Sequence, residues 1–209
     1  GIYNYGYIPI PLIMALFGSR ETLGVLLVHN VGVEVAMWTA GIVLISGKFD
    51  RSALKRLLNP PIIALIVALM VNVTGLDTRI PEWLTRLVHM LAMCSIPVGI
   101  LLSGATIGDL LGRRIMLENQ RVLLGSVAVR LGLLPAAFIL LASLMPGLSL
   151  ELKQVILIQA AMPAGILPIV LARHYGGDAS VAVKVVLVTT LCSVVTMPFW
   201  IRFGLSVAF

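Results

Sequence analysis

Long apolar stretches separated by short charged connections dominate this sequence and limit what it can fold into. The stretch 181–203, for example, carries only two charged residues, Lys184 and Arg202. The hydrocarbon core of a bilayer is about 30 Å thick and takes roughly 20 apolar residues per helical span. We therefore expect helices of membrane-spanning character at 21–47, 60–75, 83–106, 122–145, 152–162 and 181–203.

The composition agrees with a membrane protein and argues against a soluble enzyme. Hydrophobic residues make up 59% of the chain and charged residues 11%, and the mean hydropathy is +1.06. A soluble domain needs more charged surface. The sequence shows neither metal-spaced His and Cys residues, nor a phosphate loop, nor a nucleophile and base pair. We predict an all-α polytopic membrane protein that is not an enzyme, with no cofactor and no metal site.

The net charge of +6 is gathered in clusters between apolar stretches rather than on one solvent face. This distribution is typical of cytoplasmic loops and not of a nucleic-acid partner, so we expect an integral multi-pass protein of the cell (inner) membrane. The segment 48–59 has an amphipathic pattern and is expected to lie on the inner membrane surface. The clusters are Lys48, Arg51, Lys55 and Arg56; Arg113, Arg114 and Arg121; and Arg173, His174 and Lys184.

Two apolar regions are interrupted by proline and glycine. "AAMPAGILPIVLARHYGG" contains Pro163, Gly165 and Pro168, and "NYGYIPIP" begins at Asn4. The pieces that follow, 8–17 and 168–175, are too short to cross a bilayer and look like halves of broken helices. Proline frees backbone groups, each costing several kcal/mol if unsatisfied in lipid. Such backbone is tolerated where it lines a cavity, so the breaks predict a binding cavity.

The two interrupted regions share an order of features. Each gives a short half-helix, then glycine (Gly18; Gly176), then an acid (Glu21; Asp178), then a long span. Five crossings separate the copies, an odd count that makes them point in opposite directions, which is a transporter signature. The first residues already have the composition of a membrane interior, so we expect a fragment that lacks upstream spans.

The chemistry expected at the breaks favours an anion. Half-helix N-termini near Pro11 and Pro168 aim positive dipole ends at a common point, where the Asn4 amide adds a donor and an acceptor. No acid lies within either break, which weakens a sodium or proton antiporter interpretation. The predicted substrate-binding residues are Asn4, Tyr5, Pro11, Gln159, Pro163, Gly165, Ile166 and Pro168.

Several polar residues inside the spans leave alternatives open. His29, Asn30 and Glu34 either relay protons or hydrogen-bond packed helices, with Asn30 and Glu34 on one face at i, i+4 spacing. Arg130 either snorkels to the cytoplasmic face or pairs with an anionic substrate or with Glu34. We name these four residues as candidates for ion coupling or anion contact.

These motifs together resemble the auxin efflux carrier (PIN-like) family in its short-loop bacterial form. "NYGYIPIP" resembles the first crossover motif and "PAGILPIVLARHYGGD" the second. "NPPIIALIV" resembles the start of the sixth helix, and "IPVGILLSGATIGDL" the end of the seventh. The chain departs from the family at Pro9, where glycine is usual, and at Ala164, where glutamine or asparagine follows the proline.

The resemblance implies ten helices in two inverted five-helix repeats, with two crossed broken helices holding the substrate. This chain would match helices four (partial) to ten: 1–47 as the remnant of the first repeat, 48–59 as a cytoplasmic linker, and 60–209 as the second repeat with its broken helix at 152–175. The implied function is a permease or efflux carrier for a small organic anion, with a carboxylate expected, by elevator-type alternating access. The alternative is an ion-coupled (sodium or proton) symporter or antiporter of similar fold. The resemblance also implies a homodimer when the protein is full length.

Overall fold

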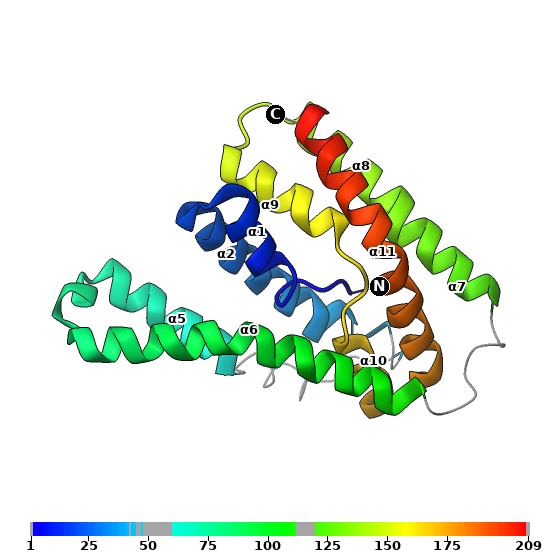
Figure 1. The fold of residues 1–209 in the computed structure, drawn as a ribbon, viewed down its shortest axis with the longest axis horizontal. Helices are drawn as coiled ribbons and strands as arrows, with labels where there is room; N and C mark the ends of the chain where they lie inside the picture. The colour runs from blue at the N-terminus through cyan, green and yellow to red at the C-terminus, as the bar shows by residue number, and fades with distance from the viewer. Residues whose placement is uncertain (1, 42, 45–46, 48–59, 112–119, 208–209) are drawn as a thin grey trace.

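The computed structural model describes residues 2–41, 43–44, 47, 60–111 and 120–207. Within these residues the chain is helical, and its β-structure is one isolated bridge (Figure 1). An all-α fold is therefore confirmed. The elements are α1 (Pro9–Phe17), α2 (Arg20–Ala36) with a π-helical turn (Met37–Gly41), α5 (Pro60–Val73), a 3-10 turn (Leu76–Arg79), α6 (Glu82–Leu111), α7 (Gln120–Val127), a second π-helical turn (Ala128–Leu133), α8 (Leu134–Leu144), α9 (Leu150–Ala161), α10 (Leu167–Tyr175) and α11 (Ala179–Val207).

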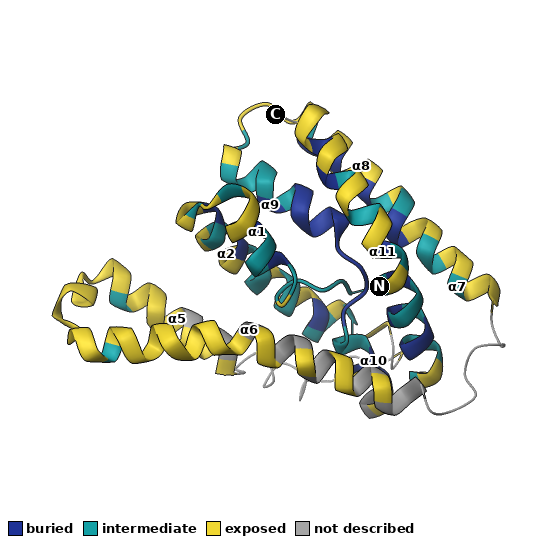
Figure 2. Ribbon diagram, viewed as in Figure 1, coloured by how far each residue is buried: buried dark blue, intermediate teal, exposed yellow. Residues whose placement is uncertain are grey.

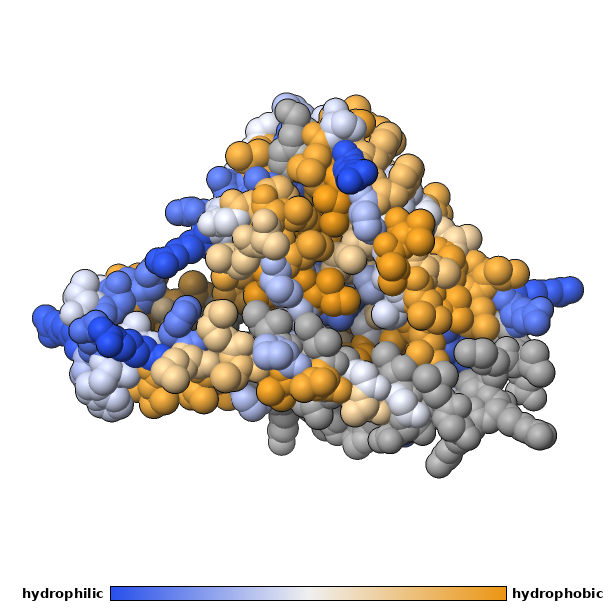
Figure 3. Space-filling model, viewed as in Figure 1, coloured by the Kyte–Doolittle hydropathy of each residue, from blue (hydrophilic) through white to orange (hydrophobic). Residues whose placement is uncertain are grey.

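Three helical stretches in the described part of the chain are long and apolar enough to cross a membrane: Arg20–Gly41, Gln120–Leu144 and Ala179–Val207. Each of the six stretches expected from hydropathy overlaps a helix. Figure 3 shows apolar side chains spread over the outer surface of α7, α8 and α11, as lipid contact requires. The chain is folded with its apolar groups outside as well as inside.

The two half-helices α1 and α10 begin and end by the same local chemistry. Each has a proline in its first two positions, where the missing N–H costs no helical hydrogen bond. Each ends at a left-handed glycine, Gly18 (φ 59°) and Gly176 (φ 81°). The next long helix then starts from a capping side chain, Ser19 before α2 and Asp178 before α11.

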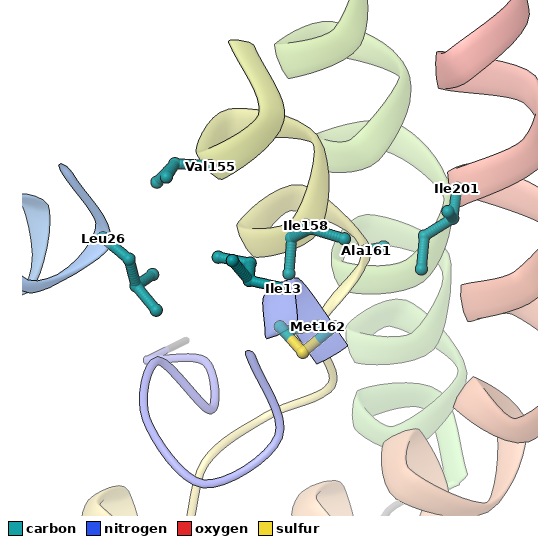
Figure 4. Close-up of a cluster of buried hydrophobic side chains, with 7 residues drawn as sticks. All are labelled: Ile13, Leu26, Val155, Ile158, Ala161, Met162 and Ile201. Atoms are coloured by element: carbon teal, nitrogen blue, oxygen red, sulfur yellow. The ribbon is translucent and has the colours of Figure 1, made fainter. Parts of the chain in front are cut away.

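α9 occupies the centre of the molecule, and α1, α2, α8 and α11 pack around it. Figure 2 shows its C-terminal half and the following connection as continuously buried. The main core cluster joins Ile158 and Met162 to Ile13 of α1, Leu26 of α2 and Ile201 of α11 (Figure 4). The position of α9 therefore fixes where its C-terminal interruption lies.

α5 and α6 form an arm of two helices that is largely exposed (Figure 2).

One expectation about charge is wrong: Lys184 lies inside α11 and is 4% exposed, not in a basic connection. The reason is that Asp178 accepts from the N–H groups of Ser180 and Val181, so α11 begins before Lys184. The segment 48–59, with Arg113 and Arg114, lies outside the described residues.

Candidate functional site

The two interruptions predicted from the sequence meet. The extended residues at the start of the chain run antiparallel to the connection between α9 and α10, with Tyr3 bridged to Ala164. The N–H of Asn4 donates to the carbonyl of Pro163 over 2.9 Å, and the N–H of Gly165 donates to the carbonyl of Ile2 over 2.9 Å. Figure 1 shows the N-terminus beside this connection, near the middle of the helices. We call this pairing the crossing.

Gly165 permits the close approach of the two backbones. A Cβ atom built at this position would lie 2.8 Å from the carbonyl oxygen of Tyr3 and 3.3 Å from the backbone nitrogen of Asn4. Real Cβ atoms do not approach backbone so closely. Glycine is therefore needed here for space and not for an unusual φ angle.

The helices that leave the crossing direct their N-termini toward it. α10 begins at Leu167, directly after the paired residues, with Ile166 at its N-cap. α1 begins at Pro9, and Pro11 lies within its first turn, beyond the paired residues. A helix N-terminus carries unsatisfied N–H groups and roughly half a positive elementary charge. The N-termini of α1 and α10 therefore contribute positive charge near the crossing, while the C-terminus of α9, at Met162, contributes carbonyl groups.

Arg130 caps the end of α9. Its Nε donates to the carbonyl of Met162 over 2.8 Å and its Nη2 to the carbonyl of Gln159 over 2.9 Å. The guanidinium also lies 4.6 Å from the centre of the Tyr3 ring. With 5% of the residue exposed, Arg130 is buried against the carbonyls that end α9. The structure favours neither snorkelling nor pairing with Glu34.

Three further side chains take part in hydrogen bonds that satisfy backbone groups at or beside the crossing. The Nδ2 of Asn30 donates to the carbonyl of Tyr5 over 2.8 Å. The Nε2 of Gln159 donates to the Oδ1 of Asn30 over 3.1 Å and to the same Tyr5 carbonyl over 3.4 Å. On the other break, the Oγ1 of Thr189 accepts from the N–H of Ala164 over 3.3 Å. Asn30 and Gln159 therefore link α2 and α9 to the first break by hydrogen bonds.

An acid reaches the first break from α2. The hydroxyl of Tyr5 donates to Glu34 Oε1, and the indole of Trp38 donates to Glu34 Oε2 over 2.8 Å. Asn30 and Glu34 both contact Tyr5, which agrees with their i, i+4 spacing on one face of α2. Sequence reasoning found no acid within either break and could not see this contact across the fold.

A cavity of about 90 Å³ lies behind the crossing. Tyr3, His29, Arg130 and Gln159 are its polar lining, and Ala160 lies among its apolar walls. His29 Nδ1 and Gln159 Oε1 are buried and have no hydrogen-bond partner. This cavity brings together three of the predicted candidates, His29, Arg130 and Gln159.

Some predicted residues meet at the crossing and others lie beside it. Asn4, Pro163 and Gly165 form the pairing, Tyr5 and Ile166 flank it, and Pro11 and Pro168 lie in the first turns of α1 and α10. Sequence reasoning missed Tyr3, Thr189 and the carbonyl of Met162 as members of the site. For Tyr3 the sequence offers only its position shortly before Pro9 and Pro11, and this position does not specify a partner.

Comparison with known proteins identifies a family. Residues 49–201 match the family model described as "Membrane transport protein". The chain is 25% identical, over 200 residues, to an uncharacterized transporter of Methanothermobacter thermautotrophicus (strain Delta H), across 94% of this chain and 63% of that relative. It therefore spans less than two thirds of the relative's length. No solved structure matches it.

The family match covers well over half of the chain, from the segment before α5 to the last third of α11. An integral membrane protein embedded in lipid follows from the match and from the apolar helices. The chain belongs to the membrane transport protein family, the family of auxin efflux carrier (PIN-like) transporters.

Proposed function

We propose that the complete protein is a secondary carrier of the cell (inner) membrane for a small organic anion, a carboxylate, held at the crossing. The observation that carries the proposal is the backbone pairing of Asn4 with Pro163 and of Gly165 with Ile2. Two unwound segments that meet between helices place polar backbone where a regular helix would hide it. A substrate then replaces the water that such backbone otherwise needs.

The charge around the crossing supports an anionic substrate. The N-terminus of α10 follows directly on the paired residues, and that of α1 begins at Pro9, a few residues beyond Asn4. The side-chain amide of Asn4 makes no hydrogen bond to any described residue, so it remains available to a ligand. We infer that Asn4 and the backbone near Gly165 and Pro168 contact the carboxylate.

Elevator-type movement of the crossing relative to a scaffold would expose the substrate alternately on the two sides. The matched local chemistry of α1 with α2 and of α10 with α11 supports an inverted repeat, with 1–47 in the first copy and 60–209 in the second. We infer a homodimer through scaffold helices for the complete protein. α5 and α6, which are largely exposed in this chain, are available for such packing.

The substrate proposal is tested by uptake into proteoliposomes that contain the complete protein. A panel of monocarboxylates, dicarboxylates and indole acids identifies the substrate. Asn4→Ala is then expected to abolish saturable uptake, whereas Asn72→Ala, which changes an exposed amide on α5, leaves it intact. Saturable uptake at the wild-type rate in Asn4→Ala would reject the assignment.

The contact between Glu34 and Tyr5 favours a second candidate, an ion-coupled symporter or antiporter. An acid joined to the first break by hydrogen bond can link protonation or sodium binding to the substrate site. Glu34→Gln should then uncouple uptake from an imposed proton or sodium gradient. Glu21→Gln, on the exposed first turn of the same helix, is the matched control. Full gradient coupling in Glu34→Gln counts against this candidate.

A further inference from the structure

The cavity behind the crossing adjoins the paired backbone through the side chain of Tyr3, and its lining includes polar side chains. It lies between α2, the π-helical turn Ala128–Leu133 and α9, and its volume is about 90 Å³. Liquid water occupies about 30 Å³ per molecule, so the cavity has room for about three waters or for one small ion with water. Cavities of this size stay empty only when their lining is apolar.

Gln159 lines this cavity and carries an unused hydrogen-bond acceptor. Its Nε2 faces two acceptors, the Oδ1 of Asn30 at 3.1 Å and the carbonyl of Tyr5 at 3.4 Å. Reversing the amide would set oxygen against oxygen at both contacts, so the orientation is fixed. Gln159 Oε1 is buried without a partner, with the residue 4% exposed. A buried polar atom without a partner destabilises the folded state unless a guest satisfies it.

His29 and Arg130 also line the cavity, and each has a hydrogen-bonding group without a partner among the described residues. His29 Nδ1 is buried without a partner. Arg130 uses Nε and Nη2 on the carbonyls of α9, and among the described residues its Nη1 has no hydrogen-bond partner. Guanidinium has five N–H donors, so these two bonds leave most of them unused.

The charge in the cavity selects the sign of a guest. The titratable residues that line the cavity are Tyr3, His29 and Arg130, and no carboxylate of the described part of the chain is among them. The carbonyls that end α9 offset about half of the Arg130 charge. The positive charge that remains attracts an anion and repels a cation.

We propose that this cavity binds one small monovalent anion, of the size of formate or chloride, between Arg130 Nη1 and the N–H at His29 Nδ1. A water molecule between the anion and Gln159 Oε1 supplies the donor that the amide oxygen lacks. The site does not use Asn4 and goes beyond the carrier function proposed above. A free inorganic ion and the carboxylate of an organic acid share this chemistry.

Anion binding is measured on the complete protein in lipid nanodiscs, as the thermal unfolding midpoint at constant ionic strength. Sodium formate, sodium chloride and sodium gluconate are compared, because gluconate is too large for the cavity. Formate is expected to raise the midpoint saturably, as a ligand of the folded state does. A response to formate alone assigns the site to carboxylates, and a response to chloride as well assigns it to inorganic anions too. Identical curves in all three salts overturn the proposal.

Two variants locate the response. Ala160→Leu fills the cavity without removing a polar group and should abolish the formate response, whereas Ala142→Leu enlarges an equally buried alanine of α8 outside the cavity and should keep it. His29→Ala should weaken formate binding about tenfold, the loss of one hydrogen bond to a charged group. Unchanged formate affinity in His29→Ala overturns the proposal even if Ala160→Leu fails to fold. No transport is measured, so this result and the uptake result with Asn4→Ala are independent.

Discussion

The N–H of Asn4 donates to the carbonyl of Pro163 over 2.9 Å and so joins the first extended residues of the chain to the interruption between α9 and α10. A pairing of so few residues is weak on its own. Side chains from three other helices therefore complete it: Asn30 from α2, Arg130 from the π-helical turn and Thr189 from α11. The crossing is stable because the packed helices support it, and substitutions in this support test that view.

Gly165→Ala should destabilise the crossing by about 1–3 kcal/mol, the usual cost of forcing a methyl group into a packed site. The added Cβ would meet the carbonyl oxygen of Tyr3 at 2.8 Å, and backbone on both sides cannot yield easily. Thermal unfolding in detergent measures the change. Gly125→Ala is the control, since a Cβ there meets nothing within 4 Å. Equal midpoints for the two variants would show that the crossing is looser than described.

Arg130→Lys should destabilise the protein by about 1.5–3 kcal/mol, the value of a hydrogen bond to a charged group. An ammonium keeps the charge but cannot hold the carbonyls of Met162 and Gln159 in the geometry of the planar guanidinium. Denaturant unfolding compares it with Arg86→Lys, at an exposed pair with Glu82. Exposed pairs contribute little, so the control should barely change. Comparable losses in both variants would contradict the capping role of Arg130.

The helices and their interruptions could be predicted from the sequence because both depend on neighbouring residues. The length of an apolar stretch sets a span, and Pro163 and Pro168 act on the turn that contains them. The partners of the freed backbone groups could not be predicted in this way. Arg130 reaches the carbonyls of α9 from a π-helical turn, whose extra residue per turn a regular 3.6-residue pattern does not anticipate.

The contact made by Thr189, a neutral side chain, could not be predicted from the sequence either. It is one of several hydroxyl residues in α11, and its sequence neighbours do not distinguish it. In the fold its Oγ1 accepts from the N–H of Ala164 at the crossing. By contrast, the shared contact of Asn30 and Glu34 with Tyr5 follows from helical spacing, although the spacing did not name Tyr5.

Thr189→Val should destabilise the protein by about 1–3 kcal/mol, because valine has the same shape and leaves the buried N–H of Ala164 without an acceptor. Thr190→Val, at the next position of α11, removes a hydroxyl that has no such contact with the crossing. Hydrogen exchange at Ala164 should accelerate in the first variant and stay unchanged in the second. Protection of Ala164 that survives Thr189→Val would mean that another group holds this N–H.

Gly204 lies where α11 packs on α9, and a Cβ there would lie 2.1 Å from Cδ1 of Leu157, a side chain that is 2% exposed. Gly204→Val should therefore destabilise the protein by about 1–3 kcal/mol through overpacking. Leu157→Ala alone should cost about 2–5 kcal/mol by leaving a cavity. In the double variant the valine enters that cavity, so the loss should be smaller than the sum of the two single losses. A double-variant cycle of unfolding free energies in detergent measures this coupling. Strictly additive losses would contradict the contact between α11 and α9 at this point.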